Sequence, residues 1–131
     1  MLSTAPISAI LPALDLERAK KFYGESLGLR TAPESRDLKE EVVFEAGDGT
    51  RVLLYHRDTI QSDHTEAGFW VQDLVKEMDE LRKKGVDFEE YDIPEMHLKT
   101  EEGIAAEGPV RTAWFKDSEG NILALNEYHA S

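Results

Sequence analysis

A histidine and a carboxylate flank a single residue in the sequence His64-Thr65-Glu66. Alternate residues of a β-strand face the same side, so both side chains share a face if a strand includes them. An imidazole and a carboxylate could hold a divalent cation, with His97 as a third ligand, or Glu66 could act as a general base. If the strand begins later, these residues belong to a solvated loop and carry out no chemistry.

Composition narrows the chemistry further. The 131-residue sequence has no cysteine, which excludes disulfides, thiolate metal sites and cysteine nucleophiles. Its net charge of −12 disfavours nucleic acid and anionic membrane surfaces as partners. No apolar stretch approaches the ~20 residues that span a bilayer, and the first residues lack the basic and apolar runs of a secretory signal. We therefore expect a cytoplasmic protein with neither nucleic acid nor membrane as partner.

The elements that position the chemistry begin with an apolar run over residues 7–14, typical of a buried strand. Asp15 is a typical helix N-cap, apolar residues follow at helical spacing, and Gly28 ends the helix. Apolar and turn patterns then predict three further strands, over residues 29–35, 41–46 and 51–56.

The same order recurs in the second half of the chain. A strand is expected over 67–72, Asp73 is the next N-cap, and Gly85 ends the second helix. Three more strands are expected, over residues 86–91, 110–116 and 121–127. The fold class is therefore α+β, with two tandem β-α-β-β-β modules, 7–57 and 64–128, in a single domain over residues 1–131.

Each module is too small to bury both faces of its own sheet. We expect the two to pack together as a curved mixed sheet around a cleft. Residues 92–109 form a connection long enough to be a lid or a binding loop.

Two segments resemble the vicinal oxygen chelate superfamily, which includes glyoxalase I, extradiol dioxygenases, and fosfomycin and bleomycin resistance proteins. The first runs from Asp15-Leu16-Glu17-Arg18-Ala19 through Phe22-Tyr23 to Leu27-Gly28-Leu29, and the second is Trp114 to Asn121, WFKDSEGN, which is similar to the family's Asp-Pro-Asp-Gly-Asn signature. The likeness covers nearly the whole chain. It implies the glyoxalase/bleomycin resistance-like fold. Because this fold hosts unrelated chemistries, the resemblance does not by itself predict a function.

The resemblance also implies where a metal would be held. The family's ligand positions fall here on Ser8, Leu53, Glu66 and Ala124, of which only Glu66 is a credible ligand. Dedicated sites supply three or more protein ligands, so we expect no metal ligand set and no cofactor. A divalent metal held by a rebuilt His64–Glu66 site is the alternative.

Because side chains other than metal ligands hold most of these positions, strand alternation and the resemblance indicate an apolar, aromatic cleft with a few polar groups. Trp70 shares a strand face with Glu66, and fosfomycin-type relatives use the positions of Thr112 and Trp114 for ligand contacts. The predicted ligand-binding residues are Ser8, Leu53, Tyr55, His64, Glu66, Thr112, Trp114, Ala124 and Asn126. Trp114 could instead be a core residue, Trp70 could pack against a helix, and Tyr55 could be a dimer-contact or rim residue.

Three functions stay open on these observations. The first is a homodimeric binder of a small organic molecule without a metal, as in bleomycin resistance proteins. The second is an enzyme of the same superfamily, either a metal-dependent lyase, isomerase or dioxygenase, or one that uses Glu66 as catalytic base with Tyr55 or His64. The third is an interaction subunit whose cleft is unused.

Overall fold

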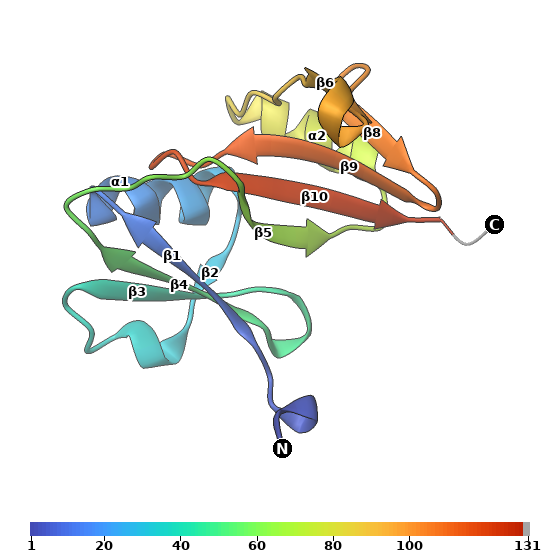
Figure 1. Ribbon diagram of the computed structural model, residues 1–131. Coiled ribbons are helices and arrows are strands. Elements are labelled where there is room, and N and C mark those ends of the chain that lie inside the picture. Colours follow the sequence, from blue (N-terminus) through green and yellow to red (C-terminus); the bar gives the residue numbers. More distant parts are fainter. Residues whose placement is uncertain (130–131) are drawn as a thin grey trace. The chain divides into compact units, whose positions relative to one another are not determined.

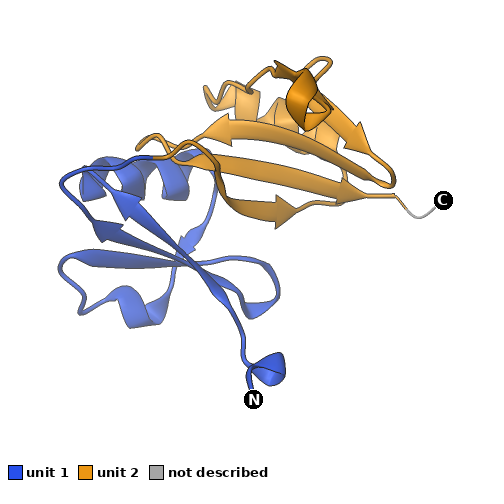
Figure 2. Cartoon of the chain, viewed as in Figure 1, with its two compact units in different colours: residues 1–61 blue, residues 62–131 orange. Residues whose placement is uncertain are grey.

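The computed structural model describes residues 1–129, and these form two compact units, residues 1–61 and residues 62 onward (Figures 1 and 2). Each unit contains one four-stranded sheet and one α-helix. The predicted α+β class is confirmed, as is the predicted repetition of strand and helix elements. In the described residues no helix is long and apolar enough to cross a membrane.

The first unit is built around a sheet with strand order β1-β4-β3-β2, in which β1 and β4 are parallel. Its helix α1, Leu16–Lys21, begins at Asp15, whose carboxylate accepts the N–H of Arg18 as predicted, and a π-helical turn, Phe22–Ser26, follows. Tyr23 is fully buried and stacks on Phe44 with ring centroids 6.1 Å apart. The strands are β1 Ser8–Ala13, β2 Arg30–Thr31, β3 Glu41–Glu45 and β4 Arg51–His56.

The second unit repeats this plan with strand order β5-β10-β9-β8 and parallel β5 and β10. Helix α2, Leu74–Lys83, begins at Asp73, which accepts the N–H of Lys76, and its Leu74 and Met78 are fully buried. The strands are β5 Thr65–Trp70, β8 Ile104–Glu107, β9 Val110–Lys116 and β10 Ile122–Tyr128. A separate small hairpin consists of β6 Asp92–Ile93 and β7 Leu98–Lys99.

The predicted strand over 86–91 is wrong. That segment reaches the sheet only through a bridge between Phe88 and Phe115 and a hydrogen bond from Glu89 N–H to the carbonyl of Trp114. The edge position beside β9 belongs instead to β8, which lies inside the predicted 92–109 connection. Because β8 and β9 are joined by a short turn, their pairing closes a much shorter loop than pairing of 86–91 with β9.

The predicted strand over 29–35 is also too long. Only Arg30–Thr31 pairs with β3, and a 3-10 turn over Pro33–Ser35 follows. Pro33 lacks a backbone N–H and cannot continue the ladder. The chain then turns so that the Ser35 hydroxyl accepts the N–H of Val43 at 2.9 Å.

Candidate functional site

The sheet of the second unit has two different faces. Phe115, Leu123 and Leu125 are buried and belong to the same side of the sheet as α2. Strand alternation places the predicted residues of β9 and β10 on the opposite side. There Trp114 pairs with Ala124 and Thr112 pairs with Asn126 in the antiparallel register, so four predicted site residues are brought together.

A register shift in β5 adds further groups to this face. Thr65 pairs with Ile122, but the next pair is Ala67 with Leu123, so Glu66 is an extra residue in the ladder, as in a β-bulge. Glu66 lies two positions before Gly68, which pairs with Ala124, and alternation therefore turns its side chain to the Ala124 side. The strand, expected over 67–72, begins instead at Thr65 and so includes Glu66.

The indole of Trp114 crosses the middle of this face. Its Nε1–H donates to the Thr65 hydroxyl at 3.1 Å, so the ring extends from β9 over β10 to β5. The Tyr91 ring meets Trp114 edge-on, with centroids 5.5 Å apart and planes at 80°. Ala124, the cross-strand partner of Trp114, is only 4% exposed. Two contacts thus fix an aromatic ring on this face.

The positions that bind a metal in the vicinal oxygen chelate family do not fit a cation here. Within this unit they hold Glu66 and Ala124, and the Ala124 methyl group offers no lone pair. The first unit offers Ser8 and Leu53 at the corresponding positions. In residues 1–129 no three His, Asp or Glu side chains gather as metal ligands, and His97 therefore does not complete a set with His64 and Glu66.

Glu66 instead has polar neighbours at the start of β5. Its Oε1 accepts the Ser62 hydroxyl at 3.1 Å and lies 3.8 Å from His64 Nε2, and its side chain is 22% exposed. The other ring nitrogen of His64 contacts the Asp63 carboxylate at 3.0 Å. This hydrogen bond with Asp63, followed by the charge of Glu66, raises the pKa of His64 above its ordinary value.

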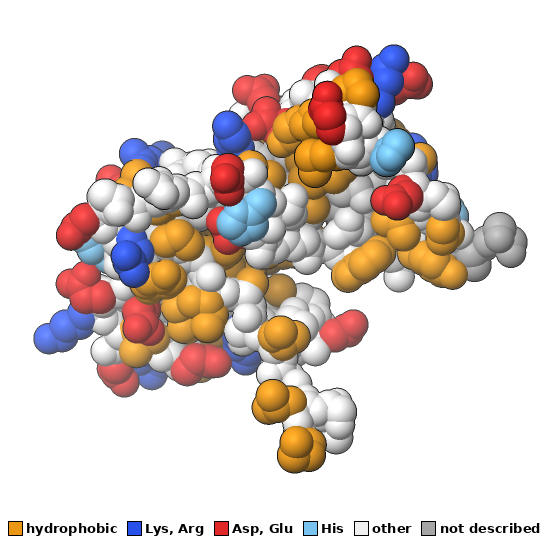
Figure 3. Space-filling model, in the orientation of Figure 1, with side chains coloured by type: hydrophobic (Ala, Val, Ile, Leu, Met, Phe, Trp, Pro, Cys, Tyr) orange, Lys and Arg blue, Asp and Glu red, His pale blue; other side chains and the backbone are white. Residues whose placement is uncertain are grey.

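The predicted residues of the first unit lie on one face of its own sheet. Leu53 pairs with Ile10, and Tyr55 with Pro12, in the parallel register, while Ser8 stands opposite Arg51 at the start of β1. Leu53 and Tyr55 are half-buried and Ser8 is exposed. Ile10 is 62% exposed, and hydrophobic side chains are visible over β3 and β4 of this unit (Figure 3). Glu41, Glu45 and Arg51 share this face in the antiparallel register of β3 and β4. The face is therefore mixed, with charged as well as apolar side chains.

In the view of Figure 3, acidic side chains are scattered over both units and basic side chains lie among them. The net charge of −12 produces a general field that repels anions.

Sequence reasoning missed several residues that shape the sheet of the second unit. Thr65 and Tyr91 orient Trp114, and no sequence pattern connects the three.

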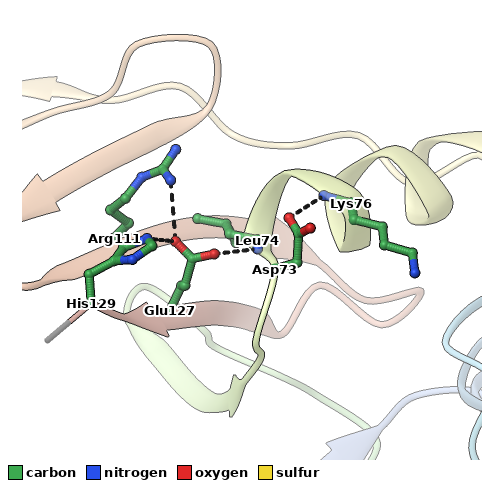
Figure 4. A network of polar contacts seen from close by, with 6 residues as sticks. All are labelled: Asp73, Leu74, Lys76, Arg111, Glu127 and His129. Carbon is green, nitrogen blue, oxygen red and sulfur yellow. Dashed lines mark hydrogen bonds and ion pairs between the residues drawn. The ribbon is translucent and has the colours of Figure 1, made fainter.

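Glu127 was missed as well. It is 4% exposed, and its carboxylate accepts the N–H of Leu74 at 2.8 Å. The same carboxylate contacts Arg111 and His129 (Figure 4). The N–H of Leu74, ahead of the contacts with His129 and Arg111, lowers the pKa of Glu127. Glu127 thereby ties the start of α2, and so the end of β5, to β10.

Comparison with known proteins identifies the fold family. The Glyoxalase/Bleomycin resistance protein/Dioxygenase superfamily matches residues 7–125 of this chain. The chain belongs to this superfamily. Its predicted resemblance is thus confirmed, and no curated protein matches the sequence significantly.

Several solved structures are similar in fold to this chain. One is a superfamily member from Sphaerobacter thermophilus DSM 20745, at 22% identity and a TM-score of 0.71, with 97% of this chain and 99% of that chain covered. TnmS3, an antibiotic binding protein from Streptomyces sp. CB03234, has 20% identity and a TM-score of 0.71, with 98% of both chains covered. Lactoylglutathione lyase from Agrobacterium tumefaciens has 17% identity and a TM-score of 0.67, with 95% and 93% covered. At these sequence identities the comparison shows similarity of fold alone.

Proposed function

We propose that this protein binds a small, planar, largely apolar organic molecule on the β5, β9 and β10 face of its second unit, without a metal. The observation that carries the proposal is the pair of tryptophans on this face. Trp114 is held in one orientation by Thr65 and Tyr91, and Trp70 is 69% exposed. Exposed large aromatic side chains are typical of binding surfaces, and rigid aromatic rings favour stacking with flat ligands.

Three further observations support the proposal. The net charge of −12 favours a neutral or cationic molecule over an anion. The fold relative TnmS3 is an antibiotic binding protein, which is a precedent for binding on this fold. Ala124 and Leu53 at two of the family's metal positions favour metal-independent binding.

Three predictions from the sequence belong to the same proposal. We propose that Ser8, Leu53 and Tyr55 contact a small molecule on the sheet of the first unit, and that the protein acts in the cytoplasm as a homodimer. Ligand-dependent chemical-shift changes at these residues and the mass in solution from light scattering test the first and last of these statements.

The test is a thermal-shift screen of planar heteroaromatic compounds, run with and without EDTA. A compound that binds the folded state raises the melting temperature, and EDTA should leave that rise unchanged. Trp70→Ala should weaken binding about five- to twentyfold because a stacking surface is lost. Val75→Ala, an exposed site on α2, is the control. Binding that requires a divalent metal, or equal affinity in Trp70→Ala, contradicts the proposal.

A second function is favoured by the contacts of Glu66. We propose, as the alternative, that Glu66 is the general base of a lyase or isomerase reaction, because its partly exposed carboxylate lies beside Ser62 and His64. For a compound found in the screen, Glu66→Gln should reduce turnover by ~10² or more if Glu66 is a base. A modest change in affinity with no measurable turnover in the unmodified protein rejects the enzymatic function.

A further inference from the structure

Gly68 occupies the middle of β5, where its backbone does not require glycine. Its φ lies outside the left-handed region. A glycine inside a strand destabilises it by about 0.5–1 kcal/mol relative to alanine and often marks a close approach of another group. Here that group is the amide of Asn126, since a Cβ on Gly68 would lie 2.8 Å from Asn126 Nδ2.

The orientation of the Asn126 amide is fixed from the other side. The hydroxyl of Thr112, its cross-strand partner on β9, donates to Asn126 Oδ1 at 2.9 Å. The carbonyl oxygen of the amide therefore faces β9 and the NH₂ group faces β5. An amide NH₂ carries two donor hydrogens, and in residues 1–129 no acceptor is found for them.

The donor lies within the proposed aromatic surface. Asn126 pairs with Trp70 in the parallel register, and Gly68 pairs with Ala124, which is the cross-strand partner of Trp114. A planar molecule resting against these tryptophans would present its edge to the NH₂ group. That edge needs a hydrogen-bond acceptor, because a half-buried donor left without a partner is costly.

We propose that Gly68, Thr112 and Asn126 form a donor subsite that selects planar ligands carrying a carbonyl or similar acceptor oxygen. Thr112 is the positioning residue, Gly68 provides the space, and Asn126 makes the contact. This inference rests on the proposed binding of planar molecules to the same face. The donor subsite adds to that proposal the chemical class of ligand that the face would select.

The test uses two fragments, 1-indanone and indane, which differ in a carbonyl group in place of a ring methylene; each is titrated into ¹⁵N-labelled full-length protein. The side-chain signals of Trp70, Trp114 and Asn126 report binding. We expect 1-indanone to bind about three- to tenfold more tightly than indane, the range of one hydrogen bond. The Asn126 NH₂ signals should shift only with 1-indanone.

Three variants separate the roles. Asn126→Asp keeps an acceptor for Thr112 but removes the donor, and Gly68→Ala displaces the amide, so each should abolish the preference for 1-indanone. Thr112→Val should reduce the preference by freeing the amide to rotate, whereas Thr50→Val, in an exposed turn, is the matched control. Unchanged indane binding in the variants shows that the face remains folded.

The outcomes distinguish the two proposals. Equal affinity for both fragments, or a preference that survives Asn126→Asp, overturns the donor subsite while leaving the aromatic face in place. Failure of both fragments to shift the tryptophan signals overturns the proposed binding face and the subsite with it.

Discussion

Replacement of Glu127 is the perturbation with the most direct structural consequence. Its carboxylate accepts the Leu74 N–H at 2.8 Å, contacts Arg111 at 3.2 Å, and also contacts His129 (Figure 4). Leu74 is the first residue of α2 and follows closely on Trp70 at the end of β5. Loss of Glu127 should therefore weaken the junction that holds the exit of β5 next to β10.

The magnitude follows from which partners are buried. The Leu74 N–H is buried, and leaving it unsatisfied in Glu127→Ala should cost about 2–3 kcal/mol. The side chains of Arg111 and His129 are 36% and 58% exposed, so their ion pairs add little. Glu127→Gln retains an acceptor for Leu74 and should cost about 1 kcal/mol, which lowers the melting temperature by about 3–5 °C.

The pH dependence has a defined sign. The folded-state pKa of Glu127 is lowered from its ordinary 4.5, chiefly by the Leu74 N–H. Ionised Glu127 therefore contributes stability that is complete above pH 4.5 and is lost as the pH falls through the lowered folded-state value. In this acidic window the free energy of unfolding of the unmodified protein should fall more steeply than that of Glu127→Gln.

Urea unfolding between pH 3 and pH 7, followed by circular dichroism, measures both quantities. Glu34→Gln is the matched control: Glu34 also has a lowered pKa, but its ion pair with Arg51 is exposed and should contribute little. If Glu127→Gln matches the unmodified protein at pH 7 and shows the same pH profile, the assigned role of Glu127 is wrong.

Two further predictions concern the candidate site. The pKa of His64, measured by NMR titration, should lie above 6.5 and fall in Asp63→Asn, because the hydrogen bond with the Asp63 carboxylate favours the imidazolium; an unchanged value would contradict this contact. Trp114→Phe removes the donor to the Thr65 hydroxyl and should cost about 1 kcal/mol in chemical unfolding and broaden the ring signals at this position; equal stability and sharp signals would show that the bond does not orient the ring.

Local sequence patterns predicted the repeated framework well. Asp15 and Asp73 each precede an amphipathic segment, and both carboxylates accept the expected backbone N–H. The same reasoning failed at residues 86–91, where the apolar alternation of a strand is present but the edge of β9 is taken by β8. Competition between two segments for one edge is decided by the length of the connecting loop, which a single-segment pattern does not contain.

The candidate site was predictable to the extent that it depends on strand alternation. The sharing of one face by Thr112, Trp114, Ala124 and Asn126 follows from period two and the register of a single hairpin. The contacts of Thr65 with Trp114 and of Gly68 with Asn126 depend on pairing between β5 and β10, which lie far apart in the sequence, and on a bulge that shifts their register. Pairing of distant strands leaves no local signal.

Ala124 lies between the two contacts that sequence reasoning missed, those of Thr65 with Trp114 and of Gly68 with Asn126. The resemblance places a metal-ligand position at Ala124, and here that position carries a methyl group opposite Trp114. The Trp114 indole reaches from β9 to the Thr65 hydroxyl on β5. Gly68 and Ala124, both small, are adjacent in the register beside it. An aromatic face with one oriented amide donor fits the proposed ligand, which stacking and one hydrogen bond would hold.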